Sequence, residues 1–369
     1  MTQTKKAAVN PFTPMFGEVP PYLAGRGLII KDMIDAFEQD GLDPNLCTIF
    51  VGARGSGKTA MLTYLAQRAQ QSGWIAAEVT AGSGMLDDIL QRLTESAAHL
   101  VDASDKRKLT GVSVGGLGSV TWENTSSEPN WRTKMNALFA QLQETNTGVL
   151  ITVDEVDPTI DEIVSLVVTF QHFVREGKRC ALLMAGLPHK VSALLTGNTT
   201  SFLRRATRRD LGLIPSYEVE DAFALTVESG GKKIDDAALD EAVAAIDGFP
   251  FMFQLVGYRA WKASTDANSI SVDNVRRGAK IARDELRCRV FDATWSELSE
   301  NDIAFLKAMS VDDGKSTRAD VTKRLGKSSS HVSTYKRRLL DAGLIEEPRS
   351  GTFRFAMPGF ADYMREMTA

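Results

Sequence analysis

One segment of the sequence has the residue types and spacing of a loop that binds a nucleoside triphosphate. Residues 52–59 read Gly-Ala-Arg-Gly-Ser-Gly-Lys-Thr, which matches the pattern Gly-x-x-x-x-Gly-Lys-Ser/Thr. Glycine lets backbone N–H groups turn inward around phosphate oxygens, where a side chain would block them. We expect Lys58 to reach the β- and γ-phosphates and the Thr59 hydroxyl to bind Mg²⁺. The predicted nucleotide contacts of this segment are Gly52, Ala53, Arg54, Gly55, Ser56, Gly57, Lys58, Thr59 and Ala60.

A second segment supplies carboxylates that suit the same chemistry. The apolar run 149–153 ends in Asp154 and Glu155. Asp154 is predicted to hold Mg²⁺ through water, and Glu155 to orient and polarise the attacking water. The order Asp-Glu favours hydrolysis over binding alone.

Phosphoryl transfer also requires a cation that stabilises charge in the transition state. The richest source is the cluster at 201–209, in which Arg204 or Arg205 is a candidate arginine finger, acting in cis or on a neighbouring subunit. A solvated helix face or a DNA-contacting patch is the alternative interpretation.

The elements that position these groups follow from the hydrophobic pattern. Apolar runs at 48–51, 75–79, 149–153 and 181–184 alternate with helix-length segments, which predicts a parallel sheet covered on both faces. The run 48–51 leads into the glycine-rich loop and a helical pattern follows it. A hairpin is predicted at 110–122, either as a partner contact or as an inert surface flap, and a helix near Trp131.

The chain is long enough for several domains. We predict a flexible arm at 1–18, a P-loop ATPase domain at 19–212, a helical lid domain at 213–290 and a winged-helix DNA-binding domain at 291–369. The helical patterns of the lid cover 217–228, 235–245, 251–263 and 272–290. The fold class is therefore α/β, a P-loop NTPase parallel sheet followed by an all-α lid and a C-terminal winged helix.

The last part of the chain has the pattern of a DNA reader. Helices at 317–325 and 328–342 flank a short turn, which is the helix-turn-helix arrangement. Val332, Tyr335 and Leu339 should pack inward, and a hairpin at 344–355 should form a wing. The predicted contacts to double-stranded DNA are Lys327, Ser330, Ser333, Thr334, Lys336, Arg337, Arg338, Arg349 and Arg354.

Local charge supports this prediction. Between residues 315 and 338 there are eight basic side chains and one acidic side chain, whereas the whole chain has a net charge of −4. A basic run is also compatible with a solvated surface, and a winged helix can also bind protein.

The remaining composition indicates a cytoplasmic protein. Cys47, Cys180 and Cys288 fit neither a disulfide framework nor a zinc pattern and are expected to be buried thiols. No membrane span or secretory signal is expected.

Taken together, these motifs resemble the AAA+ ATPases, in the branch that contains the origin-recognition ATPases and their prokaryotic relatives. The resemblance rests on Tyr22-Leu23-Ala24-Gly25-Arg26, the glycine-rich loop, Asp154-Glu155 and the C-terminal winged helix. It implies ATP as the nucleotide, with Gly25 and Arg26 beside the adenine. Gly248-Phe249-Pro250 also resembles the Gly-x-Pro of the STAND signalling NTPases, which implies that Pro250 packs near the nucleotide.

The sequence departs from this pattern at two positions. Phe251 and Met252 stand where the related ATPases have a sensor arginine, and the run 184–188 lacks the usual Asn, Ser or Thr. Slow hydrolysis is therefore expected.

The leading hypothesis is an ATPase whose nucleotide state controls DNA binding by the winged helix. The alternative is a STAND-like switch that engages a protein partner. A homo-oligomer is compatible with both, and a metabolic kinase is disfavoured because it would not need a winged helix.

Overall fold

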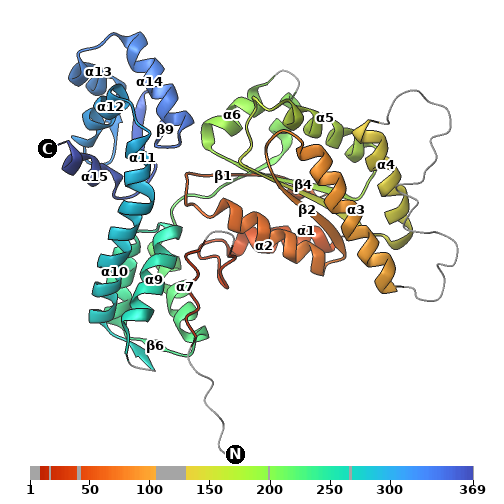
Figure 1. Ribbon diagram of the computed structural model, residues 1–369, viewed down its shortest axis with the longest axis horizontal. Coiled ribbons are helices and arrows are strands. Elements are labelled where there is room, and N and C mark those ends of the chain that lie inside the picture. Colours follow the sequence, from red (N-terminus) through yellow and green to blue (C-terminus); the bar gives the residue numbers. More distant parts are fainter. Residues whose placement is uncertain are drawn as a thin grey trace, which may run out of the picture.

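The computed structural model describes residues 9–15, 18–39, 43–104, 130–197, 200–265 and 268–368 (Figure 1). The hairpin predicted at 110–122 lies outside these residues. The helix predicted near Trp131 is present as α4 (Trp131–Leu142).

A five-stranded parallel sheet organises the first part of the chain. The strands are β1 (Cys47–Val51), β2 (Trp74–Thr80), β3 (Gly148–Asp154), β4 (Cys180–Gly186) and β5 (Thr207–Asp210). Their order is β2-β3-β4-β1-β5, and every pair is parallel. Four strands lie where the apolar runs predicted them, whereas the polar edge strand β5 was not predicted.

Helices cover both faces of this sheet, as predicted. One face carries α1 (Gly27–Glu38) and α2 (Lys58–Gln71), whose apolar side chains pack against Phe50 and Leu150. The other face packs Ile49 and Ile151 against four helices. These are α3 (Met85–Ser104), α4, α5 (Asp161–Arg175) and α6 (Pro188–Thr196). Short 3-10 turns lie at Pro44–Leu46, Gln143–Thr145 and Ser201–Arg205.

A helical lid follows the sheet, at the positions that the periodicity predicted. It consists of α7 (Ser216–Ser229), α8 (Asp236–Ile246), α9 (Pro250–Ala263) and α10 (Val272–Leu286). The short strands β6 (Lys233–Ile234) and β7 (Ser269–Ile270) pair beside them. Figure 1 shows the lid beside α2, on the side of the sheet where the glycine-rich loop lies.

The prediction of a flexible arm at the N-terminus is wrong for residues 9–15. Phe12 is 2% exposed and lies in the core of the lid. Its ring centroid is 5.0 Å from that of Phe223 in α7 and 5.9 Å from that of Phe253 in α9. An apolar side chain buried this deeply holds the segment on the lid.

A long helical connection joins the lid to the end of the chain. Helix α10 continues through a π-helical turn, Arg287–Phe291, into α11 (Asp292–Ser296). The C-terminal module then contains α12 (Glu300–Ser310), α13 (Arg318–Leu325), α14 (Ser329–Asp341) and α15 (Phe360–Met367). Its antiparallel sheet has the order β8 (Ser316–Thr317), β10 (Thr352–Phe355), β9 (Ile345–Arg349).

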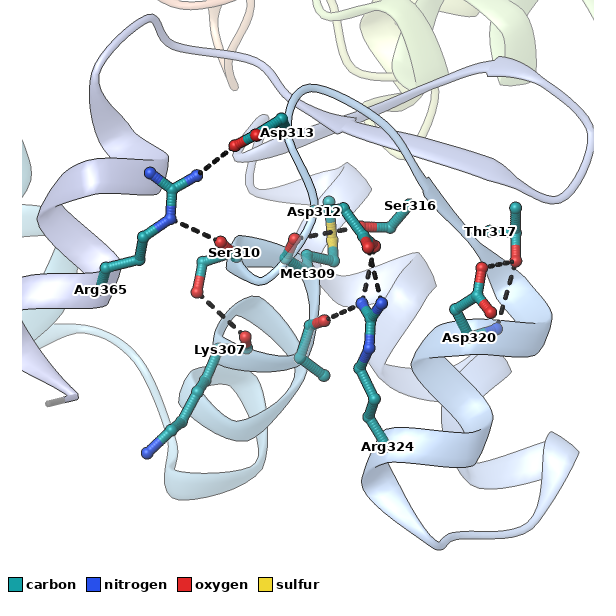
Figure 2. Close-up of polar contacts among 11 residues, drawn as sticks. Lys307, Met309, Ser310, Asp312, Asp313, Ser316, Thr317, Asp320, Arg324 and Arg365 are labelled. Atoms are coloured by element: carbon teal, nitrogen blue, oxygen red, sulfur yellow. Dashed lines mark hydrogen bonds and ion pairs between the residues drawn. The ribbon is translucent and has the colours of Figure 1, made fainter.

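Charged side chains tie the elements of this module together (Figure 2). Arg324 of α13 donates to the Ala308 carbonyl at 2.7 Å and holds both carboxylate oxygens of Asp312 at 2.6 Å. Arg365 of α15 donates to the Ser310 carbonyl at 2.7 Å. Arg324, one of the basic residues counted between 315 and 338, therefore has a structural role within the module.

Candidate nucleotide-binding site

The glycine-rich loop connects β1 to α2 and leaves its backbone free to face a ligand. Gly57 precedes α2 with φ of 88°, and Gly55 has φ of 76°, a backbone region that favours glycine. The N-terminus of α2 points its unpaired N–H groups and the positive end of its dipole at this loop. The Ser56 side chain is buried, and its hydroxyl has no hydrogen-bond partner among the described residues.

The hydrogen bonds of the Lys58 ammonium group are made to backbone carbonyl oxygens of the same loop. Its Nζ donates to the carbonyl oxygens of Gly52 at 2.9 Å and Ala53 at 2.8 Å. Burial lowers the pKa of this ammonium group, and the opposing influence of Asp154 and Glu155 does not offset the effect. An anionic phosphate beside Lys58 would raise the pKa of the ammonium group again.

The structure brings the two predicted metal ligands together. The Thr59 hydroxyl donates to Asp154 Oδ2 at 2.5 Å, although β1 and β3 are separated by β4 in the sheet. A hydroxyl and a carboxylate in contact at the phosphate loop suit Mg²⁺, which uses few protein oxygens together with phosphate and water. Among the described residues, no group of three or more His, Cys, Asp or Glu side chains is placed to hold a metal ion.

Glu155 follows in an unusual backbone conformation. Its φ is 54°, in the left-handed region, and its N–H donates to Asp154 Oδ1 at 2.8 Å. Positive φ at a residue other than glycine is uncommon and is concentrated at functional sites. The turn leaves the Glu155 side chain exposed at the end of β3.

A cavity of about 260 Å³ adjoins the loop. Of the predicted nucleotide contacts, it is lined by Arg26, Gly55, Ser56, Gly57, Lys58, Thr59, Ala60 and Pro250. Sequence reasoning missed a second group of lining residues, from the N-terminal segment and the lid, among them Thr13, Pro14, Met15, Phe251 and Gln254. The only sequence signal for these was the position of Phe251 next to Pro250.

Four predicted contacts lie outside this cavity. Gly52 and Ala53 offer their carbonyl oxygens to Lys58, and Gly25 packs against the lid, because a Cβ there would lie 2.7 Å from Ile214 Cγ2. Arg54 points instead toward the C-terminal module. It lines a second cavity of about 110 Å³ together with Asp302 and Arg338.

Arg26, at the start of α1, contacts the segment that follows β5. It is 8% exposed, and its Nη2 donates to the Gly212 carbonyl at 2.6 Å. Burial lowers the pKa of this guanidinium, against the influence of Glu218.

The arginine pair is placed away from the cavity. Arg204 and Arg205 belong to the 3-10 turn before β5 and are exposed, and Arg204 Nε donates to the Leu195 carbonyl at 3.1 Å. Neither lines the cavity among the described residues, so a role as a finger in cis has no support from these contacts.

The end of β4 is apolar, as the sequence indicated. β4 is buried along its whole length, including Met184 and Ala185. Phe249 and Phe251 lie against the glycine-rich loop, since a Cβ on Gly55 would lie 2.7 Å from the Phe249 ring and 3.6 Å from Phe251 Cβ.

The family comparison agrees with this geometry. Residues 42–195 match the AAA domain. Residues 289–364 match a domain of unknown function (DUF8462). No curated protein matches the chain.

Solved structures extend the likeness beyond the AAA domain. The Walker-type ATPase of Pyrococcus abyssi superposes with a TM-score of 0.64 at 13% identity, covering 92% of this chain and 95% of that one. The ORC2 protein of Aeropyrum pernix in its ADP form gives a TM-score of 0.54 at 15% identity, covering 96% and 98%. At these identities the likeness concerns the fold alone, which is a P-loop NTPase fold with a helical C-terminal region.

In the described part of the C-terminal module, only some of the predicted DNA-contacting side chains are both exposed and not held by hydrogen bonds or ion pairs to other elements of the module. Val332 and Leu339 are buried as predicted, and Tyr335 is half-buried against His331. Seven members of the predicted set are exposed: Lys327, Ser330, Thr334, Arg337, Arg338, Arg349 and Arg354.

Four of the predicted contacts are engaged within the module. Ser333 faces α13, where it accepts a hydrogen bond of 2.6 Å from Arg318 Nη2. Three basic residues form ion pairs: Lys336 with Glu347 at 3.0 Å, Arg338 with Asp302 at 3.1 Å and Arg354 with Glu346 at 2.5 Å. Their charge is partly neutralised, so the basic surface is smaller than the sequence count indicated.

The module also touches the AAA domain beside the nucleotide site. His189 Nε2 of α6 lies 3.2 Å from Asp341 Oδ1 at the end of α14. A Cβ on Gly343 would lie 3.0 Å from Leu187 Cδ2, in the segment that follows β4. Figure 1 shows α14 and β9 facing α6 across this contact. Among the described residues, no helix is both long and apolar enough to cross a membrane.

Proposed function

We propose that this chain binds ATP with Mg²⁺ and hydrolyses it slowly. The observation that carries the proposal is the contact between the Thr59 hydroxyl and the Asp154 carboxylate at the mouth of the glycine-rich loop. Lys58 would leave the Gly52 and Ala53 carbonyls to bind the phosphates. When bound, Mg²⁺ would offset charge on the phosphate oxygens. Glu155 is the base that would orient the attacking water.

Slow turnover is supported by what surrounds this site. The side chains of β4 are buried and apolar at its end, and the cavity is lined by Phe251, which follows Gly248-Phe249-Pro250 where the resemblance implies a sensor arginine. Exposed Arg204 and Arg205 remain candidates for a finger supplied to a neighbouring copy in a homo-oligomer.

Calorimetric titration with ATP and Mg²⁺ tests the binding. Lys58→Ala is expected to abolish it, whereas Lys31→Ala, which removes an exposed lysine outside the cavity, should bind ATP as the unmodified chain does. Equal binding by the two variants would contradict the proposal.

We further propose that the C-terminal module is a winged helix that binds double-stranded DNA under control of the nucleotide. Ser330, Thr334 and Arg337 form an exposed face on α14 that suits a major groove. The contacts His189–Asp341 and Leu187–Gly343 support control by nucleotide, because they connect α14 to the segment after β4.

Binding of a labelled duplex across a salt series, with ATP, ADP or no nucleotide, tests this step. Electrostatic contacts to phosphates should make the affinity fall as salt rises. No duplex binding at ~50 mM salt with ATP and Mg²⁺ present would rule out the DNA proposal. Sequencing of DNA cross-linked to the protein in its own cell would identify the target.

A second function is favoured by one observation. Pro250 of Gly248-Phe249-Pro250 lines the nucleotide cavity, the place implied by the resemblance to STAND signalling NTPases. In that case the C-terminal module would engage a protein partner, and ATP would change that binding without any effect of duplex DNA.

A further inference from the structure

Residues 9–15, here called the N-terminal strap, are built into the lid by backbone and side-chain contacts. The Val9 N–H donates to the Gly230 carbonyl at 3.1 Å. Asn10 Nδ2 donates to the Tyr258 carbonyl at 3.3 Å, and the Thr13 N–H donates to Gln254 Oε1 at 2.9 Å. The strap therefore runs along α9 toward the nucleotide cavity.

Two glycines of the lid provide the space that the strap occupies. A Cβ on Gly257, in the middle of α9, would lie 2.2 Å from Phe12 Cδ1. A Cβ on Gly230 would lie 2.6 Å from the Val9 carbonyl oxygen and 2.7 Å from Pro11 Cδ. Glycine inside a helix costs about 1 kcal/mol relative to alanine, so the Phe12 contact offers a physical reason for Gly257.

The far end of the strap forms a wall of the nucleotide cavity. Thr13, Pro14 and Met15 line it together with the phosphate loop. The Thr13 hydroxyl is buried and has no hydrogen-bond partner among the described residues. A buried polar atom without a partner is costly, and such atoms are rare in folded proteins.

The Gln254 carboxamide is oriented by the strap. Because its Oε1 accepts from the Thr13 N–H, its NH₂ group is left as a donor at the same wall. A hydroxyl that can accept and an amide that can donate lie next to each other. Adenine offers the complementary pair on its Watson–Crick edge, the amino group at C6 and the N1 acceptor.

We propose that the N-terminal strap is the base-recognition wall of this site, where Thr13 Oγ1 accepts from the adenine amino group and Gln254 donates to a ring nitrogen. The proposal rests on the proposed ATP binding and names the residues that select the base. Since Phe12 fixes the strap to the lid, base binding also holds the lid against the AAA domain. On its Watson–Crick edge guanine has a carbonyl oxygen in place of the amino group and an N1–H in place of the N1 acceptor, so the Gln254 NH₂ would face a donor.

The test compares ATP, GTP and inorganic tripolyphosphate, each with Mg²⁺, by calorimetric titration of the unmodified chain and of Thr13→Val. Tripolyphosphate has no base, so it reports the phosphate loop alone. Loss of one hydrogen bond predicts that Thr13→Val weakens ATP binding by about fivefold to tenfold. The same variant should leave tripolyphosphate unchanged and reduce the preference for ATP over GTP. Thr94→Val, in α3 and outside the cavity, is the matched control and should bind all three as the unmodified chain does.

The outcomes separate this inference from the function on which it rests. If the unmodified chain binds tripolyphosphate but shows no preference for ATP over GTP, the base-recognition wall is refuted and the phosphate site survives. The same holds if Thr13→Val binds ATP as the unmodified chain does. If the unmodified chain binds neither ATP nor tripolyphosphate, both proposals are overturned.

Discussion

The contact between Phe12 and Gly257 predicts that Gly257→Ala destabilises the lid when Phe12 is present and stabilises it when Phe12 is replaced by alanine. In the unmodified chain, Gly257→Ala places a Cβ 2.2 Å from both Cδ1 and Cε1 of the Phe12 ring. The ring must move, and overpacking of this kind costs about 1–3 kcal/mol. In a Phe12→Ala background the space is open. There, alanine in the middle of α9 should stabilise the helix by about 1 kcal/mol.

The two substitutions should therefore be coupled by at least about 2 kcal/mol, the sum of the clash and the helix preference. Phe12→Ala alone removes a side chain that is 2% exposed and packed between Phe223 and Phe253. Such truncations cost about 3–5 kcal/mol in a core. The stability lost on Phe12→Ala cannot exceed the free energy with which the strap binds to the lid, because beyond that loss the strap detaches.

Native-state hydrogen exchange of α7 and α9 measures this coupling, because it reports the local opening free energy of the lid. Gly278→Ala is the matched control. The Cβ it adds in α10 would lie 2.4 Å from the Ala260 backbone nitrogen, so it should destabilise the lid with or without Phe12. If Gly257→Ala destabilises the lid equally in both backgrounds, the strap does not occupy this socket.

Three further predictions concern the other sites. Glu155→Gln should bind ATP normally but lower phosphate release by about 10²-fold or more, since the base is lost while its shape is kept; normal turnover would remove Glu155 from catalysis. Arg337→Ala should weaken duplex binding by about 1–3 kcal/mol in a titration at fixed salt, and an unchanged affinity would exclude this residue from the interface. Iodoacetamide at pH 8 should alkylate exposed Cys288 alone, as read by mass spectrometry. Burial raises the pKa of Cys47 to about 11 and that of Cys180 to about 12, so both stay protonated and unreactive, and early labelling of Cys180 would contradict the buried environment.

The sheet and the glycine-rich loop between β1 and α2 were predictable because their signals are local. The apolar runs of β1 to β4 reflect strands buried on both faces, and the loop pattern fixes Lys58 and Thr59 within one segment. The edge strand β5 has no such signal. Its residues alternate between half-buried and exposed, and three of the four are charged. Cys288, expected to be buried, is exposed for a similar reason, because its environment in the π-helical turn is set by distant packing.

The strap and the charge pairs were not predictable because their partners lie far away in the sequence. Phe12 follows polar and proline residues, and only its fit to Gly257 in α9 makes it a core residue. Likewise, the pairs Arg338–Asp302 and Lys336–Glu347 join different elements of the C-terminal module. The count of charges over residues 315–338 included Arg338 and Lys336, but not Asp302 and Glu347, which lie outside that range. This is why the helix faces of α14 were largely correct while its free positive charge was overestimated.

The glycine-rich loop adjoins both the lid and the C-terminal module. Gly55 lies against Phe249 of the lid, and Arg54 lines a cavity with Asp302 and Arg338 of the C-terminal module. Asp302 is 1% exposed, and its Oδ1 has no hydrogen-bond partner among the described residues, so a small shift of Arg54 changes the electrostatics of a buried carboxylate. Phosphate binding must rearrange this loop, because Lys58 has to leave the carbonyls that it now holds. The proposed control of α14 therefore requires only movements of a few side chains at the loop, transmitted to a module that is attached through a π-helical turn.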